Sequence, residues 1–237
     1  SYPYLYPFPY HDALPLPDPD PEPEPEPDIE GTEDADNIDG TESDDVIDAL
    51  GGDDTVAGGL GNDIIDGGSG NDILRGDANR RSPLGMGGDD ILVGGVGNDI
   101  FGGKSGNDIL RGDAGDDFIW GDDGDDILMG VTGNDILVGD NMSGGSGNDL
   151  FVFGNGEGTD TIVDFEVGSD RIGLVQGELA FEDLTITQEG KNTLLGVADS
   201  GETLAILNGV DASTLTQDSF AIVPDVSNPE EAQDFLG

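Results

Sequence analysis

Residues 31–152 repeat with a period of nine, and this period limits the possible folds more than any other feature of the sequence. Units such as GGSGNDILR, GDAGDDFIW and GVTGNDILV begin with a glycine-rich stretch and end with large apolar residues, many of them β-branched. Glycine-rich stretches favour turns, and short apolar runs of this kind favour strands. One unit cannot bury its apolar face alone, so the period predicts a stack of short strands joined by turns.

Two positions of the repeat keep the same chemistry in all twelve units. The sixth position is always an aspartate: Asp36, Asp45, Asp54, Asp63, Asp72, Asp90, Asp99, Asp108, Asp117, Asp126, Asp135 and Asp149. The eighth is always apolar: Ile38, Ile47, Val56, Ile65, Leu74, Leu92, Phe101, Leu110, Ile119, Leu128, Leu137 and Phe151. Because side chains alternate across a strand, we expect the eighth to face the core and the seventh to face solvent. The seventh is mostly isoleucine from Ile64 onward, which predicts exposed apolar ladders on both flat faces, a common mark of an interface.

The charge of the chain requires either disorder or bound cations. Its 53 acidic and 7 basic residues give a formal net charge of −46, and low hydrophobicity with such charge alone would favour disorder. One buried apolar side chain per unit cannot offset the ordering of its backbone at roughly 1 to 2 kcal/mol per residue, so we expect a metal to supply the difference. The chain has no cysteine, so the ligands must be oxygens, and aspartates beside turn carbonyls suit calcium. Glutamate is absent between Ser43 and Gly156, which indicates cages of fixed size.

The units resemble the nonapeptide repeats of RTX proteins, GGxGxDxUx with U a large apolar residue, over about half of the chain. The resemblance implies an all-β fold, a right-handed parallel β-roll or β-solenoid, in which each unit is a turn followed by a short strand. Two units then complete one coil. It also implies multiple Ca2+ ions, each between the turns of units n and n+2 on one edge of the roll, with the sixth-position aspartates as ligands.

The family's pattern further implies backbone ligands for each ion. One unit supplies the carbonyls of its second and fourth positions with its aspartate, and the next unit on the same edge supplies the carbonyls of its first and third positions with its aspartate. Carried onto this chain, the expected sites are Gly95, Gly97 and Asp99 with Gly112, Ala114 and Asp117; Lys104, Gly106 and Asp108 with Gly121, Asp123 and Asp126; Asp113, Gly115 and Asp117 with Gly130, Thr132 and Asp135; and Leu50, Gly52 and Asp54 with Gly67, Ser69 and Asp72.

Two places interrupt the period. Residues 79–87 are either an insertion in one turn or a degenerate unit, which would put Arg81 at an aspartate position and Pro83 at a core position and remove one calcium site. We favour an insertion, because residues 139–143 lengthen another turn that also begins with Gly-Asp. The simpler interpretation of both loops is that they are tolerated surface insertions. The alternative is that one of them contacts a partner.

The two ends of the chain lack the repeat, and we divide the protein into an arm (1–28), the roll (29–152), a cap (153–223) and a short helical tail (224–237). The arm is extended and proline-rich, with five aromatic residues, Tyr2, Tyr4, Tyr6, Phe8 and Tyr10, before a proline–acid linker. It is either unstructured or docks on another surface. In the cap, antiparallel strands are expected at 184–187, 193–197, 203–207 and 220–223. Asp160 and Asp164 are candidates for one further calcium, and the last residues are similar to the ends of type I secretion substrates.

The sequence does not point to catalysis. Its one histidine, His11, lies in the arm, so neither an HExxH zinc site nor a histidine-based triad is possible, and we expect no enzyme. The negative charge argues against nucleic acid, and no apolar run suggests membrane insertion. We expect a secreted, extracellular or cell-surface calcium-binding structural protein that assembles with copies of itself through residues 1–10 and the isoleucine ladders. The alternatives are a C-terminal calcium and secretion module of a larger exported enzyme or adhesin, and a monomeric calcium buffer; a carbohydrate partner is left open.

Overall fold

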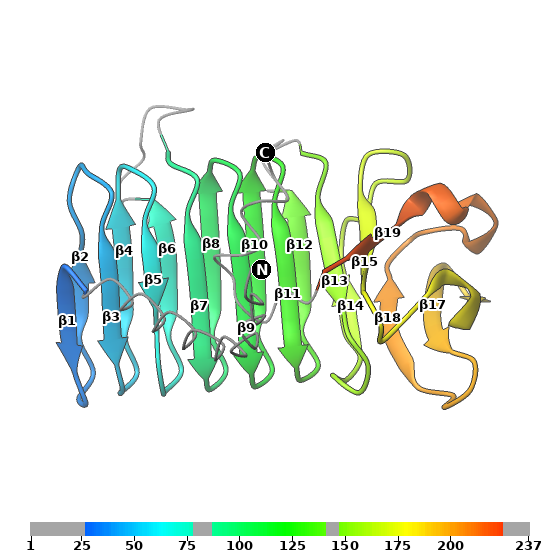
Figure 1. Cartoon of the computed structure of the whole chain (residues 1–237), viewed down its shortest axis with the longest axis horizontal. Helices are drawn as coiled ribbons and strands as arrows, with labels where there is room; N and C mark the ends of the chain where they lie inside the picture. The colour runs from blue at the N-terminus through cyan, green and yellow to red at the C-terminus, as the bar shows by residue number, and fades with distance from the viewer. Residues whose placement is uncertain (1–26, 78–86, 141–146, 225–237) are drawn as a thin grey trace, which may run out of the picture.

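A computed structural model describes residues 27–77, 87–140 and 147–224. Its strands form two sheets that face each other across the core (Figure 1). The nine-stranded sheet contains, in order, β1 (Ile29–Thr32), β3 (Val46–Leu50), β5 (Ile64–Asp66), β7 (Ile91–Val96), β9 (Ile109–Ala114), β11 (Ile127–Thr132), β13 (Leu150–Phe153), β15 (Arg171–Val175) and β19 (Phe220–Val223). The ten-stranded sheet contains β16 (Leu184–Glu189), β17 (Asn192–Val197), β18 (Thr203–Leu207), β14 (Asp160–Ile162), β12 (Ile136–Asp140), β10 (Phe118–Asp123), β8 (Ile100–Ser105), β6 (Ile73–Asp77), β4 (Thr55–Gly59) and β2 (Asn37–Asp39).

Successive units alternate between the two sheets, so each strand pairs in parallel with the strand two units away. Val46 lies opposite Ile64, and Phe118 lies opposite Ile136, each a separation of two nine-residue units. The predicted parallel β-roll is therefore confirmed. Short 3-10 turns at Phe181–Asp183, Ala212–Thr214 and Gln217–Ser219 complete the described structure, in which no helix is long and apolar enough to cross a membrane.

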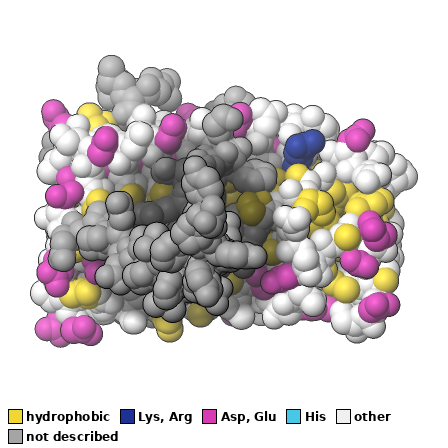
Figure 2. Space-filling view, in the orientation of Figure 1, with side chains coloured by type: hydrophobic (Ala, Val, Ile, Leu, Met, Phe, Trp, Pro, Cys, Tyr) yellow, Lys and Arg dark blue, Asp and Glu magenta, His cyan; other side chains and the backbone are white. Residues whose placement is uncertain are grey.

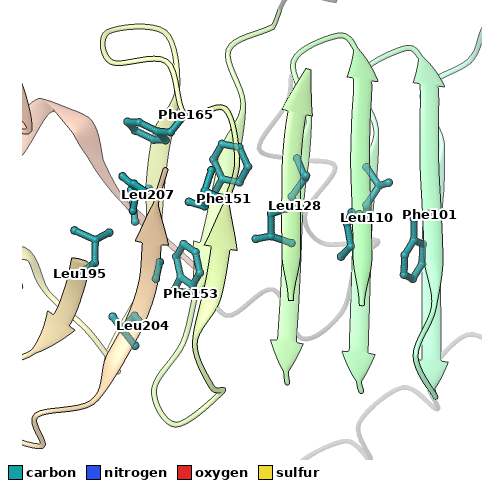
Figure 3. Close-up of a cluster of buried hydrophobic side chains, with 14 of the residues drawn as sticks. Phe101, Leu110, Leu128, Phe151, Phe153, Phe165, Leu195, Leu204 and Leu207 are labelled. Carbon is teal, nitrogen blue, oxygen red and sulfur yellow. The ribbon is translucent and has the colours of Figure 1, made fainter. Parts of the chain in front are cut away.

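The eighth position of the repeat forms the core, as expected. Its side chains from Ile47 to Phe151 are all buried in one cluster that runs along the axis of the roll. Figure 3 shows Phe101, Leu110, Leu128 and Phe151 in this cluster, which continues into Leu195 and Leu207 of the C-terminal region. Burial of each such side chain contributes about 1.5 to 3 kcal/mol, which is one strong apolar contact per unit.

The turns require left-handed backbone at the second and fourth positions of the unit. At the fourth position Gly97 has φ 150°, and a Cβ there would collide with the carbonyl oxygen of Gly70 in the neighbouring turn. The second position also has positive φ but tolerates side chains, as at Lys104 (φ 89°) and Val131 (φ 70°). The glycine pattern of the sequence therefore reflects turns that pack directly on one another and leave no room for a side chain.

The interruption after residue 77 is an insertion. Ile64 pairs with Ile91 and Ile73 pairs with Ile100, so strands on both sides of the interruption keep their partners despite nine additional residues. In a degenerate unit Ile73 would instead have paired with Ile91. The alternative that placed Arg81 at an aspartate position is therefore wrong, and the aspartate column passes the insertion without a gap.

The C-terminal region differs from its prediction in one strand. Strands β16, β17 and β18 form the expected antiparallel meander. Strand β19, at 220–223, was expected to be antiparallel but pairs in parallel with β15, and β18 pairs in parallel with β14. The chain thus returns to the ends of both sheets, where β18, β17 and β16 extend one sheet beyond β14 and β19 extends the other beyond β15, so the last strands of the roll are not left open. The predicted helical tail and most of the predicted arm lie outside the described residues.

The seventh-position ladders are exposed on one face only. On the ten-stranded sheet Ile100 is 43% and Ile136 37% exposed, whereas on the nine-stranded sheet Ile109 is 1% exposed. There Ile91, Ile109 and Ile127 form a second cluster with Met129 and Val152, which occupy the ninth position beside them. The ten-stranded sheet has Gly102 at an equivalent ninth position. The expectation of exposed ladders on both faces is therefore wrong for the nine-stranded sheet.

Candidate calcium sites

The sixth-position aspartates form two continuous ladders, one along each edge of the roll. In both, the backbone N–H of one aspartate donates to Oδ1 of the next at 2.7–3.1 Å. One ladder contains Asp36, Asp54, Asp72, Asp99, Asp117, Asp135 and Asp160. The other contains Asp45, Asp63, Asp90, Asp108, Asp126, Asp149 and Asp170. In Figure 2, acidic side chains are also spread around the margin of the molecule, where the turns lie.

The second carboxylate oxygen of most ladder aspartates is buried and has no hydrogen-bond partner. These oxygens are Oδ2 of Asp54, Asp63, Asp72, Asp90, Asp99, Asp108, Asp117, Asp126, Asp135 and Asp149. Leaving a charged oxygen buried and unpaired costs several kcal/mol, and proteins normally avoid it. Two parallel rows of such oxygens are therefore the arrangement expected of a chain that holds cations at its edges.

Backbone carbonyls lie beside these free oxygens. A Cβ built on Gly94 would lie 2.5 Å from Oδ2 of Asp99 and 2.8 Å from the carbonyl oxygen of Gly112, so both oxygens face one point. The same relation joins Asp108 to Gly121 and Asp117 to Gly130. Among the described residues, no three carboxylate or imidazole side chains converge closely enough to hold a metal by themselves. Each ion would therefore need carbonyl ligands, which is the donor mixture that calcium accepts.

The four predicted ligand sets are each brought together on one edge. The N–H groups of Gly97, Gly106, Gly115 and Gly52 donate to the carbonyls of Ala114, Asp123, Thr132 and Ser69, respectively, at 2.8–3.0 Å. The second-position residues Gly95, Lys104, Asp113 and Leu50 share the left-handed backbone of these turns. The paired aspartates of each set are neighbours in a ladder. The assignment of individual atoms as ligands stays a prediction.

Burial raises the pKa of the carboxyls in the middle of the ladders. It raises the pKa of Asp90 and Asp149 to about 8 and that of Asp117 to about 7, against the ordinary 3.8, although backbone N–H donors act in the opposite direction. Burial, followed by the charges of Asp126 and Asp90, also places the pKa of Asp108 well above 3.8. Buried carboxylates that repel one another in this way are stabilised by a nearby cation.

The first two predicted ligands have other partners. Oδ2 of Asp36 accepts from the N–H and Oγ1 of Thr32, and Oδ2 of Asp45 accepts from the N–H and Oγ1 of Thr41. In these two units the second position is threonine. At the other end of the roll, Oδ2 of Asp170 accepts from the N–H of Glu166 at 2.7 Å. Hydrogen bonds thus satisfy these three carboxylates at the ends of the ladders, and the free oxygens lie between them.

The two candidates for a further calcium accept hydrogen bonds from different parts of the roll. Asp160 extends one ladder by accepting from the N–H of Asp135, whereas Asp164 accepts from the N–H groups of Gly139 and Asp140. Sequence reasoning missed Asp77, which is 2% exposed and makes no hydrogen bond of good geometry. Burial raises its pKa to about 6, although the N–H groups of Ser105 and Gly88 lie near enough to oppose this. The available signal was the Gly-Asp pair that opens each interrupted turn.

Comparison with known proteins identifies the repeat. The family described as RTX calcium-binding nonapeptide repeat (4 copies) matches residues 30–65, 51–80, 84–101, 102–137 and 139–162, together more than half of the chain. Two similar solved structures are an extracellular lipase from Serratia marcescens and a subunit of the mannuronan C5-epimerase from Azotobacter vinelandii. The lipase is 21% identical with a TM-score of 0.33, over 81% of this chain and 39% of the lipase. The epimerase subunit is 19% identical with a TM-score of 0.19, over 84% of this chain and 86% of the subunit.

A search among curated proteins finds no significant match. The family match and the edge ladders nevertheless agree residue by residue, because the matched units contain the aspartates whose free oxygens line both edges. The calcium expected from the repeat is the cation that these oxygens and carbonyls suit. The chain belongs to the family of RTX calcium-binding nonapeptide repeat proteins.

Proposed function

We propose that the protein is a secreted, non-catalytic structural protein whose roll folds on binding calcium and which then assembles with copies of itself into an extracellular filament or surface layer. The observation that carries the proposal is the pair of ladders with ten buried, unpartnered carboxylate oxygens. Without cations, the cost of burying these unpaired charges opposes folding. Bound cations would bridge neighbouring coils and stabilise the fold.

A calcium-driven fold suits a protein that works outside the cell. Extracellular calcium modules bind with dissociation constants of about 10⁻⁴ to 10⁻³ M, far above the free calcium inside cells. A chain with this affinity would be unfolded where it is made and folded where it is released. RTX repeats are characteristic of secreted proteins, which supports the extracellular location.

Assembly is supported by the outer face of the ten-stranded sheet. Ile100 and Ile136 are well exposed there, and Phe118 and Trp120 lie between them on β10. Apolar side chains repeated along a flat face commonly mark a contact surface. The net charge of −46 keeps molecules apart until calcium neutralises the edges, so the same ion would control both folding and association.

Titration of the chelated chain with calcium, followed by circular dichroism and by light scattering, tests both steps. We expect β structure and large particles to appear together below about 10 mM calcium, and magnesium, which demands a tighter octahedral shell, to fail at the same concentration. β structure in the presence of chelator at pH about 8, where the ladder carboxyls begin to lose their protons, would contradict calcium-driven folding. A folded monomer at every calcium concentration would contradict assembly and favour a calcium buffer or a module of a larger protein.

A further inference from the structure

The outer face of the ten-stranded sheet contains a hollow centred on Gly102. Gly102 pairs with Arg75 of β6 on one side and with Trp120 of β10 on the other, so a missing side chain separates two long ones. The hollow has a volume of about 430 Å3. Ile100 and Ile136 are exposed on this face, so its apolar side chains are accessible.

The walls of the hollow combine one aromatic side, apolar rungs and a polar rim. Trp120 packs on Phe118 with ring centroids 3.9 Å apart, and Ile73 and Ile100 lie beside them along the sheet. At the rim, Nζ of Lys104 pairs with the Asp122 carboxylate at 2.8 Å. A site of this kind suits uncharged rings. A proline ring would make the apolar contacts, and a tyrosine ring would add a hydroxyl group that can hydrogen-bond at the polar rim.

We infer that this hollow, here called the Gly102 hollow, binds residues 1–10 of a second copy of the chain; the inference rests on the assembly proposed above. Residues 1–10, SYPYLYPFPY, contain all four tyrosines of the protein and no charged side chain. They are therefore the segment least repelled by a chain of net charge −46. Proline-rich segments of this composition bind to aromatic-lined grooves because their extended form loses little entropy on binding.

The spacing of the arm matches the spacing of the sheet. A polyproline II helix has three residues per turn and rises about 3.1 Å per residue, so every third residue recurs after about 9.3 Å. Neighbouring strands lie about 4.8 Å apart, so every second strand recurs after about 9.6 Å. An arm that lies along the axis of the roll would place Tyr4, Pro7 and Tyr10 opposite every second strand. Arg75 and Trp120, which flank the Gly102 hollow, are two strands apart.

The linker favours a second copy over the chain's own roll. Residues 18–28 alternate proline with six acidic residues, which makes a stiff, self-repelling spacer of about 30 Å. Such a spacer resists the reversal needed to lay the arm back on the acidic molecule from which it emerges. We expect it instead to present the arm to a neighbour, and a head-to-tail contact of this kind builds open chains.

Trp120 is the single tryptophan of the protein and reports on the Gly102 hollow directly. In saturating calcium we expect its emission to shift to shorter wavelength as the protein concentration rises, because the arm of another molecule excludes water from the ring. Two full-length variants should lose the shift: one with Tyr4 and Tyr10 replaced by serine, and Gly102→Val. A Cβ at Gly102 meets only side-chain ends, those of Lys104 at 3.2 Å from Nζ and of Asp122 at 3.7 Å from Oδ2, so the valine fills the hollow without disturbing the backbone. Thr55→Val, on the same sheet but outside the hollow, is the matched control and should keep the shift.

Each outcome decides one claim. Emission independent of both concentration and the arm tyrosines would overturn the inference, as would loss of the shift in Thr55→Val alone. A shift that depends on the tyrosines but not on concentration would mean that the arm binds its own roll, which overturns the second-copy assignment. Particles that form equally in wild type and in Gly102→Val would leave the proposed assembly standing and refute this contact. Absence of particles together with a concentration-dependent shift would refute the filament and support the contact.

Discussion

In a central ladder aspartate such as Asp126, the two carboxylate oxygens have different surroundings. Oδ1 accepts a backbone N–H from the neighbouring coil and fixes the register, while Oδ2 faces inward toward glycine carbonyls. Glutamate is one methylene longer and could not place one oxygen on the backbone N–H and the other beside the carbonyls, which explains why it is absent from the units with free oxygens. The sequence revealed this column because its chemistry recurs every nine residues. It could not reveal that Thr32 and Thr41 satisfy Asp36 and Asp45, because that contact depends on side-chain rotamers within two atypical turns.

Replacing a central ladder aspartate should remove calcium. Asp108→Asn keeps an oxygen that can accept the N–H of Asp90 but puts an amide nitrogen in place of the free oxygen. We expect at least one fewer bound ion and a calcium midpoint raised about tenfold, equivalent to about 1.4 kcal/mol. Asp36→Asn is the matched control, because Thr32 already occupies its Oδ2. Titration calorimetry that found equal losses in both variants would contradict the assignment of the free oxygens.

The ladder carboxyls also predict how the calcium-free chain responds to pH. Burial raises the pKa of Asp90 and Asp149 from 3.8 to about 8, so between these values the folded state binds more protons than the unfolded state. Stability without calcium should therefore be greatest at low pH and be lost as the pH rises through the folded-state pKa. In chelator, circular dichroism should show more β structure at pH about 5 than at pH about 8. A β signal that grew with pH in chelator, or an equal gain at low pH in saturating calcium, would contradict this account.

At the scale of elements, strand pairing tolerates interruption because each turn contacts only the turns above and below it. The nine residues 79–87 leave both neighbouring registers unchanged. The parallel roll and its core were predictable from the period, since the alternation of side chains along each short strand leaves one position per unit to face the core. The pairing of β19 with β15 was not, because after residue 151 no repeat restricts which strand edge a segment joins. The clustering of Ile91, Ile109 and Ile127 with Met129 and Val152 was likewise not predictable, because the ninth position of the repeat follows no fixed pattern.

Deleting residues 79–87 should leave the roll intact. The junction then reads GDAGDDILV, whose first six residues are identical to 112–117, a unit that already forms a regular turn. We expect an unchanged number of bound calcium ions and a free energy of unfolding higher by less than about 1 kcal/mol, because a shorter loop costs less entropy to close. Deleting residues 103–111, a complete unit with Asp108 and Leu110, is the control and should lower the ion count. Loss of calcium-dependent β structure after the first deletion would show that the loop has a structural role.

At the scale of the whole molecule, the roll behaves as a linear stack whose ends need separate solutions. Its N-terminal turns use threonine–aspartate hydrogen bonds in place of free oxygens. Its C-terminal end is covered by the β16–β18 meander, which extends the ten-stranded sheet beyond β14, and by β19 on the other sheet (Figure 1). Because stability in such stacks is a sum of units and neighbouring interfaces, damage at one end should remain near that end.

The locality of the stack can be tested in the meander. Leu195 of β17 is buried against the end of the core, close to Leu207 in Figure 3, and Leu195→Lys would place a charge there without a partner. We expect residues 184–223 to lose protection in hydrogen exchange, because an unpaired buried charge costs several kcal/mol. The calcium bound by units before residue 136 should remain, since their contacts are with other coils. Thr187→Lys, an exposed position in the adjacent strand, should change neither property. If Leu195→Lys abolished calcium binding along the whole chain, the roll and the meander would fold as one cooperative unit, and the stack would not be linear.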